Sequence, residues 1–153
     1  MRKFVYLIFA IRFLVCEAAH AQHKPPCTPA EYRQVEDEAV TLRTWDALYK
    51  SYRQYRHCWD HADDVDADEG YSESIARILA DHWETLPRLA QLITKDRGFG
   101  NFVGLDATMD MKDVAKIKNN ALRHCPAGLS GICTKLKKDA DRSLAEDDDA
   151  HKN

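Results

Sequence analysis

The sequence predicts an all-α fold, a small helical bundle with one long helical hairpin and two shorter helices packed across it. Apolar side chains recur every three or four residues through several segments of the 153-residue chain, which is the spacing of one face of an α-helix. No segment of useful length alternates apolar and polar residues as a half-buried strand would. No internal repeat is present, so we expect one domain with one core.

Residues 1–21 have the pattern of a cleaved export signal. A short positive head precedes an apolar run at 4–16 that only Arg12 interrupts. Ala19 and Ala21 then place small residues at the positions that a signal peptidase reads. The apolar run is too short to span a bilayer, which needs about 20 apolar residues. We therefore expect cleavage after Ala21 and a periplasmic or secreted mature protein.

The first helix is expected to follow an extended lead-in at residues 22–28. Thr28 is a suitable N-cap residue, and Pro29 suits the first helical position. Thr44 could begin a second helix, but one continuous helix over 30–57 is the simpler interpretation because no glycine or proline interrupts it. Its apolar and aromatic stripe is Tyr32, Val35, Ala39, Leu42, Trp45, Tyr49, Tyr52 and Tyr55.

A polar, acidic stretch at residues 58–70 is expected to form a loop before the second long helix. Ser72 suits an N-cap, and apolar residues then repeat at helical spacing over 75–93. Pro87 lies inside this run. Because proline removes a backbone donor and clashes with the preceding turn, we expect a kink or a break there.

Two shorter helices complete the expected bundle. Residues 97–106 carry three glycines and two phenylalanines and are expected to form a loop or a short helical turn. Thr108 or Asp110 caps the next helix, which ends at Cys125 because Pro126 follows it. Ser130 or Gly131 opens the last helix.

One helical domain is thus expected over residues 29–144, followed by a disordered acidic tail at 145–153. Signal cleavage removes three cations and one acid, so the formal net charge falls from −3 to −5. A net negative protein repels nucleic-acid phosphates, which argues against a nucleic-acid partner. The mature sequence also has no apolar segment long enough to cross a membrane.

Four cysteines remain after cleavage, and an even count in an exported chain predicts two disulfides with three possible connectivities. Cys125 and Cys133 lie eight residues apart across a turn, so we expect them to pair. A straight helix over 28–57 would hold Cys27 and Cys58 roughly 46 Å apart at 1.5 Å per residue. A disulfide needs Cα atoms within about 7 Å, so we predict that these two are not bonded within one chain.

One long segment and the cysteines around it resemble an uncharacterised family of small exported bacterial proteins: EGYSESIARILADHWETLPRLAQL at 69–92, Cys58 upstream, and the Cys125-Pro126…Cys133 pair downstream. The resemblance covers about residues 27–136. It implies export, a helical fold and structural cysteines, and it brings no known activity or site.

Two histidines and three aspartates are weak candidates for a metal site: His57, His61, Asp64, Asp66 and Asp68. The histidines are four residues apart, which on a helix places both rings on one face for zinc. The aspartates alternate as in a calcium loop, but Glu69 and Ile75 stand where an EF-hand needs glycine and glutamate. A solvated acidic turn is the simpler interpretation, and no cofactor is expected.

Residues 49–56 interleave tyrosines with cations, a pattern that can hold an acidic partner. The simpler interpretation is a helix with its tyrosines inward and Lys50, Arg53 and Arg56 outward. These three cations are weak binding candidates, directed at a protein or a cell-envelope partner.

Two functional hypotheses follow. The favoured one is a non-catalytic exported protein that binds a protein or envelope partner, because the sequence has no convergent catalytic set. The alternative is a small metal-dependent hydrolase centred on His57, His61 and the acidic loop.

Overall fold

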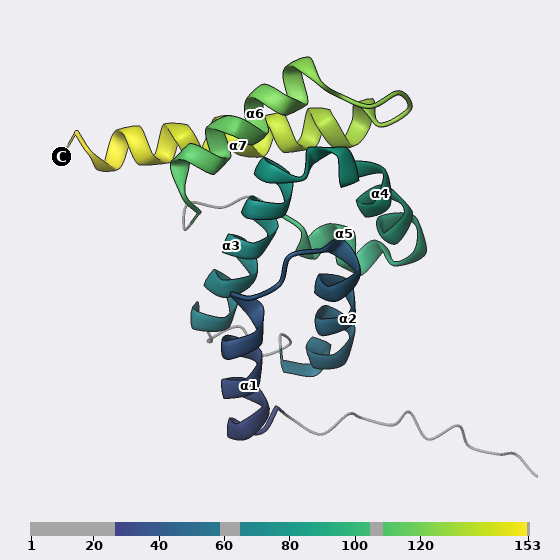
Figure 1. Cartoon of the computed structure of the whole chain (residues 1–153). Coiled ribbons are helices and arrows are strands. Elements are labelled where there is room, and N and C mark those ends of the chain that lie inside the picture. Colours follow the sequence, from purple (N-terminus) through teal and green to yellow (C-terminus); the bar gives the residue numbers. More distant parts are fainter. Residues whose placement is uncertain (1–26, 59–64, 105–108, 153) are drawn as a thin grey trace, which may run out of the picture.

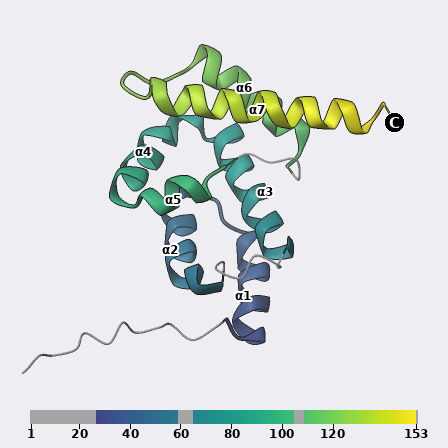
Figure 2. The same cartoon turned by 180° about the vertical axis from the view of Figure 1, so that it is seen from behind.

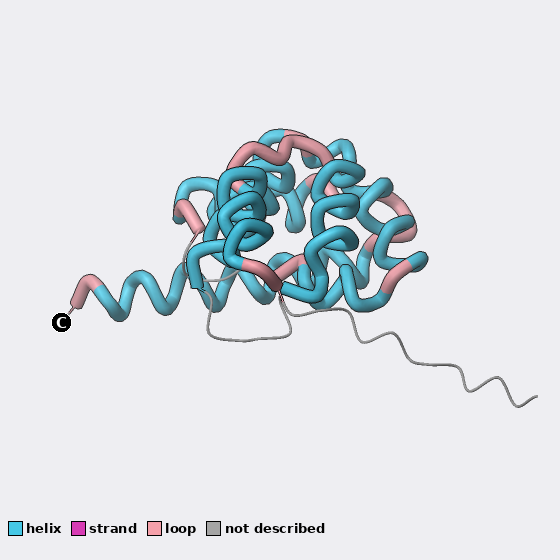
Figure 3. The backbone as a smooth tube through the Cα atoms, turned by 90° about the horizontal axis from the view of Figure 1, so that it is seen from below, coloured by secondary structure: helices cyan, strands magenta, loops and turns pink. Residues whose placement is uncertain are grey.

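The computed structural model describes residues 27–58, 65–104 and 109–152, and it confirms the all-α helical bundle. Every described segment is helix or connecting loop (Figures 1 and 3). The described elements, in chain order, are α1 (Pro29–Ala39), α2 (Trp45–Tyr55), η1 (Arg56–Cys58), α3 (Val65–Asp81), η2 (Trp83–Thr85), α4 (Leu86–Lys95), α5 (Arg97–Phe102), α6 (Met111–Arg123) and α7 (Ser130–Ala150).

The helices form two groups that share α3. At one end, α1 packs on α3, while α2 contacts α3 and α4, and α5 follows α4 (Figure 1). At the other end, α6 and α7 lie side by side across the C-terminal end of α3 (Figures 1 and 2). Trp83 joins the groups because its Nε1 donates to the carbonyl oxygen of His124 at 2.8 Å. None of the described helices has the length and apolar character that a membrane span requires.

The prediction of one continuous helix over 30–57 is wrong. The chain leaves the helical path after Ala39 and begins α2 at Trp45, where the Thr44 hydroxyl accepts from the backbone N–H of Ala47 at 3.2 Å. Arg43 stabilises the turn because its Nη1 donates to the carbonyls of Val40 and Leu42, at 2.9 and 3.0 Å. These carbonyls lie beyond the helical ladder and need such partners.

Tertiary packing explains why the chain turns at this point. Ser74 of α3 donates its hydroxyl hydrogen to the carbonyl oxygen of Ala39, the last residue of α1. Gly70 allows the close approach, since a Cβ there would lie 3.0 Å from the Ala39 Cβ and 3.1 Å from a Val40 methyl. The end of α1 is therefore held against α3, and α2 runs back beside it.

The turn also corrects the prediction about the first cysteine pair. Cys27 and Cys58 are bonded, with Cα atoms 4.7 Å apart, because the fold-back brings the start of α1 to the end of α2. The predicted Cys125–Cys133 disulfide is confirmed, with a Cα separation of 6.0 Å. The even cysteine count thus predicted the number of disulfides correctly, and the straight-helix assumption produced the wrong exclusion.

The boundaries of the later helices differ from expectation in two places. α3 begins at Val65, so the predicted loop at 58–70 is helical in its second half, and Ser72 is buried inside the helix. The predicted break near Pro87 is confirmed, because α3 ends at Asp81 and Pro87 lies in the first turn of α4. A proline is tolerated there because the first-turn N–H groups have no intrahelical acceptor.

The C-terminal half follows the predicted caps more closely. Asp110 caps α6, accepting from the N–H of Lys112 at 2.8 Å, and α7 begins at Ser130 as predicted. α7 then continues to Ala150, so the segment predicted as a disordered tail from 145 is helical over six of its residues. Ion pairs one turn apart support this end, including Lys152 with Asp149 at 3.3 Å.

An aromatic cluster fixes α2 against α5 and α3. Tyr52 lies 5.3 Å from Phe99 and 4.9 Å from Phe102, measured between ring centroids, and Phe102 meets the Tyr71 ring at 5.1 Å. Tyr71 also shares a buried hydrogen bond with Ser51 of α2. Burial raises the pKa of the Tyr71 phenol, so this hydroxyl stays protonated. The cluster sets which face of α2 points outward.

Candidate functional site

The structure places the three predicted binding cations on the outer face of α2 and at its end. Lys50, Arg53 and Arg56 are all exposed, while Tyr52 and Tyr55 are buried at 4% and 2% exposure. The inward tyrosines and outward cations match the simpler interpretation of this segment. Arg53 lies 3.6 Å from the Asp96 carboxylate and the Arg56 guanidinium lies 5.9 Å from the centroid of the Tyr52 ring, so both have defined neighbours, whereas Lys50 has no ion pair within the described residues.

Further cations come from the α4–α5 segment, which contacts α2. Arg88 of α4 pairs with Asp46 at the start of α2, and Arg53 lies 3.6 Å from the Asp96 carboxylate. The Lys95 ammonium lies 5.4 Å from the centroid of the Tyr49 ring. We call the cations of these two segments, residues 43–58 and 83–104, the basic seam, and its members are Arg43, Lys50, Arg53, Arg56, Arg88, Lys95 and Arg97.

The basic seam differs in charge from the rest of the protein. Residues 43–58 and 83–104 together contain its seven cations and three acids, a formal net charge of +4 in a chain whose net charge is −3. Two of the three acids pair with cations of the seam, Asp46 with Arg88 and Asp96 with Arg53, and the third, Glu84, lies 3.7 Å from the His82 ring. The Arg88 hydrogen bonds lower the pKa of Asp46. Such a segregated charge attracts anionic partners and accelerates their encounter.

A pocket of about 460 Å³ opens at the N-terminal end of α2, where the seam begins. Trp45 and Ile78 form its apolar floor, and Trp45 is fixed because its Nε1 donates to the Thr85 hydroxyl at 2.9 Å. The exposed side chains of Arg43 and Arg88 stand at its rim. This size lies within the range of ligand sites, about 300–1,000 Å³. Its remaining lining residues are Thr44, Asp46, His82 and Thr85.

The metal candidates remain largely outside what the structure describes. His61 and Asp64 lie outside the described residues, and Asp66 and Asp68 belong to α3. Within the described ranges, no group of three or more histidine, cysteine, aspartate and glutamate side chains could hold a metal ion. The metal site therefore stays a prediction.

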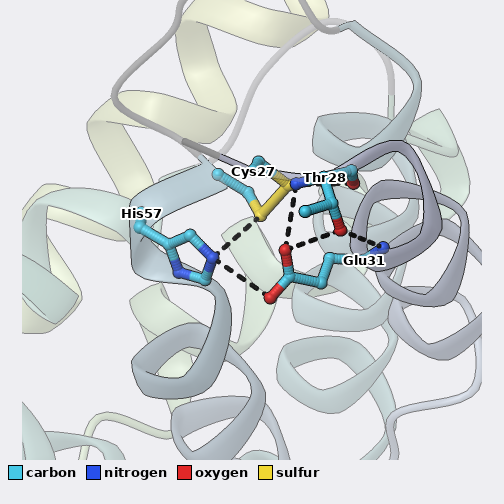
Figure 4. Close-up of polar contacts among 5 residues, drawn as sticks. Cys27, Thr28, Glu31 and His57 are labelled. Carbon is cyan, nitrogen blue, oxygen red and sulfur yellow. Dashed lines mark hydrogen bonds and ion pairs between the residues drawn. A yellow bond between two sulfur atoms is a disulfide. The ribbon is translucent and has the colours of Figure 1, made fainter. Parts of the chain in front are cut away.

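His57, the one metal candidate with a described side chain, lies beside the Cys27–Cys58 disulfide (Figure 4). Its Nε2 is 3.5 Å from the Glu31 carboxylate and 3.8 Å from the Cys58 sulfur. Glu31 in turn accepts hydrogen bonds from the Thr28 N–H at 2.9 Å and from the Thr28 hydroxyl at 2.8 Å. These bonds and, to a smaller extent, His57 lower the pKa of Glu31.

Sequence reasoning did not find this cluster. The Thr28-x-x-Glu31 spacing is the signature of a capping box, which the structure confirms. That spacing explains the position of Glu31, but its meeting with His57 depends on the fold-back of α2 onto α1. Once the Cys27–Cys58 pairing is known, His57, which precedes Cys58 in the chain, has to lie near Thr28, which follows Cys27.

Comparison with known proteins adds no assignment. No family model matches the sequence, and neither a curated protein nor a solved structure matches the chain.

We expect the protein to lose stability in acid through carboxylates whose pKa the fold lowers. The pKa values of Glu31, Asp46 and Asp141 lie below their ordinary values of 4.5, 3.8 and 3.8 because each accepts hydrogen bonds from a neighbour. A lowered folded pKa stabilises the protein above the unfolded pKa, and this stabilisation is lost as the pH falls through the folded pKa. Urea denaturation at pH 6 and at pH 3 measures the loss.

The variant Asp141→Asn isolates one contribution, because Asp141 of α7 pairs with Lys118 of α6 across the contact of the two helices and with Lys137 one turn earlier in its own helix. Its loss of stability between pH 6 and pH 3 should be smaller than that of the unmodified protein. Asp148→Asn, an exposed acid near the end of the same helix, is the control. Equal pH dependence in Asp141→Asn and the unmodified protein would contradict the expectation.

Proposed function

We propose that the mature chain is a non-catalytic exported protein that binds an acidic protein partner through the basic seam. The observation that carries the proposal is the +4 charge of the segments forming the seam in a chain of net charge −3. Random scatter of the charged residues would leave α2, α4 and α5 close to neutral. Arg43, Lys50 and Arg97 add to the argument because they are exposed and have no carboxylate partner within the described residues.

A protein partner fits the surface better than a lipid surface. An amphipathic helix that lies in a membrane surface buries large apolar side chains beside its cations. Among the described residues the exposed large apolar side chains are Val40 and Leu122, and neither belongs to the seam or lines its pocket. The pocket beside the seam can instead receive an apolar side chain of a folded partner. Nucleic acid is disfavoured by the net negative charge of the whole chain.

Export is part of the proposal and rests on two kinds of observation. Residues 1–21 have the charge, apolar run and small residues of a signal peptide. The chain also forms two disulfides, Cys27–Cys58 and Cys125–Cys133, which persist in oxidising compartments outside the cytoplasm. The resemblance to small exported bacterial proteins supports the same location.

Charge reversal within the seam tests the proposal. The double variant Lys50→Glu/Arg97→Glu reverses two exposed cations that hold no ion pair within the described residues. The control Lys112→Glu/Lys138→Glu changes the net charge by the same amount on α6 and α7, away from the seam. Both variants should keep the helical circular dichroism spectrum, because all four side chains are exposed.

Affinity capture from envelope extracts, followed by titration of each captured protein in isolation, gives the measurement. We expect an acidic partner whose affinity falls about tenfold or more in the seam variant and stays within about twofold in the control. Its affinity should also fall with added salt, because the seam is solvent-exposed. Equal affinity of a captured partner for the two variants would overturn the proposal, as would the capture of nothing specific by the unmodified protein.

A further inference from the structure

The two cysteines of the Cys27–Cys58 disulfide differ in exposure to solvent. Cys27 is partly exposed at the start of the described chain, whereas Cys58 is 3% exposed. A thiolate attacks a disulfide at one sulfur and expels the other, so access decides which sulfur is attacked. The geometry therefore directs attack to Cys27 and makes Cys58 the leaving group.

A potential hydrogen-bond donor, the His57 ring, lies beside the Cys58 sulfur. His57 Nε2 lies 3.8 Å from the Cys58 sulfur, and the ring is largely enclosed, with 12% of its side chain exposed. The other ring nitrogen, Nδ1, is buried and has no hydrogen-bond partner within the described residues. The neutral ring therefore carries its hydrogen on Nε2, because a buried N–H without an acceptor is the less favourable arrangement.

Glu31 positions this histidine. Its Oε1 lies 3.5 Å from His57 Nε2, and its other oxygen accepts from both the N–H and the hydroxyl of Thr28. Thr28 is the residue after Cys27, so the capping box of α1 ties the histidine, the carboxylate and the disulfide into one small cluster (Figure 4).

We propose that Cys27 is a thiol-exchange site, at which an external thiolate forms a mixed disulfide while His57 stabilises the departing Cys58 thiolate. The new S–S bond joins the incoming sulfur to Cys27, and the Cys27–Cys58 bond breaks with its electron pair on the Cys58 sulfur. The single Nε2–H of His57, which faces Glu31 Oε1 at 3.5 Å while the disulfide is intact, turns to the departing sulfur 3.8 Å away and donates a hydrogen bond to the thiolate. That bond lowers the pKa of the Cys58 thiol and makes its thiolate a better leaving group. The first step is an exchange, with no net oxidation or reduction.

A second thiolate can then attack the incoming sulfur of the mixed disulfide. This releases Cys27 as a thiolate and leaves both cysteines reduced, while the two external thiols become one disulfide. The co-reactant is a thiol, and a small thiol or a cysteine of a protein partner supplies the same chemistry. The inference does not depend on the basic seam.

The second disulfide provides an internal reference in the same molecule. Cys125 is exposed and Cys133 is 4% exposed, so this pair also has one accessible and one buried sulfur residue. The Cys125 sulfur lies 3.7 Å from the Pro126 carbonyl oxygen, a group that has no hydrogen to donate. Exchange at this pair should not respond to changes at His57.

The test measures mixed-disulfide formation with glutathione on the mature protein. Samples are quenched in acid, and peptide mass mapping gives the rate of adduct formation at each cysteine. We expect the first adduct of this pair on Cys27, and His57→Phe should slow it about tenfold relative to the Cys125–Cys133 pair. His57→Gln, which retains an N–H donor, should recover part of the rate.

Loosening of the fold cannot imitate this result. A variant that opens the structure exposes the disulfide and speeds the exchange, whereas loss of the Nε2–H donor slows it. An unchanged ratio of the two rates in His57→Phe, or a glutathione adduct on Cys58 in place of Cys27, would overturn the proposal. Replacement of the unrelated exposed His82 by phenylalanine should leave the ratio unchanged.

Discussion

Replacement of Trp83 by alanine is expected to lower the free energy of unfolding by about 3–5 kcal/mol, the usual range for a tryptophan removed from a core. Trp83 is 9% exposed and lies in the short helix between α3 and α4. Its loss leaves a cavity where the two groups of helices meet. It also removes the hydrogen bond to the carbonyl of His124, the C-cap residue of α6. One side chain therefore supports the contact between both halves of the bundle.

Trp83→Phe separates the two causes. Phenylalanine fills much of the volume but cannot donate to His124, so this variant should lose about 1–3 kcal/mol, the range for an acceptor left without its partner. Urea denaturation followed by far-UV circular dichroism measures both variants. A loss below about 1 kcal/mol in Trp83→Ala would show that the two groups of helices are held together by other contacts.

Helix content was predictable from the sequence because the apolar spacing is a local signal. The caps at Thr28 and Asp110 and the break before Pro87 were predicted for the same reason, since each depends on a few neighbouring residues. These features are determined by backbone hydrogen bonding within one or two turns. They hold wherever the segment lies in the fold.

The break after Ala39 was not predictable in this way. Residues 30–57 contain no glycine or proline, and the apolar stripe continues across the break. What ends α1 is a hydrogen bond from Ser74 and the close approach of Gly70, both from α3 more than 30 residues away in the chain. Tertiary contacts of this kind override local propensity. The one local signal of the break was Thr44, a candidate N-cap that caps α2 in the structure, and the continuous apolar stripe outweighed it.

The same distinction between local and tertiary signals separates the site residues that were predicted from those that were not. Lys50, Arg53 and Arg56 were recognised because they share one face of one helix. The rest of the basic seam was not, because Arg88 and Lys95 reach it from α4 only after the bundle has formed. The cluster around His57 was missed for a related reason, since the straight-helix interpretation placed the two ends of residues 28–57 far apart.

Removal of the Cys27–Cys58 disulfide is expected to lower the free energy of unfolding by about 3.7 kcal/mol. The cross-link closes a loop of 31 residues, and by the chain-entropy relation a longer loop restricts the unfolded chain more strongly. The same relation gives about 2.5 kcal/mol for Cys125–Cys133, whose separation is eight residues. Each pair is removed as a double alanine variant, so that no unpaired thiol remains to exchange with the other disulfide.

The order of the two losses is a sharper test than either value. Cys27 and Cys58 join the start of α1 to the end of α2, so they close the turn at 40–44 that the sequence did not reveal. Cys125 and Cys133 join neighbouring helices whose short connection already limits the unfolded chain. Urea denaturation of the two double variants at one pH compares them directly. A larger loss on removing Cys125–Cys133 would show that strain or residual structure outweighs loop entropy, and that packing of α1 on α3 holds the turn without the cross-link.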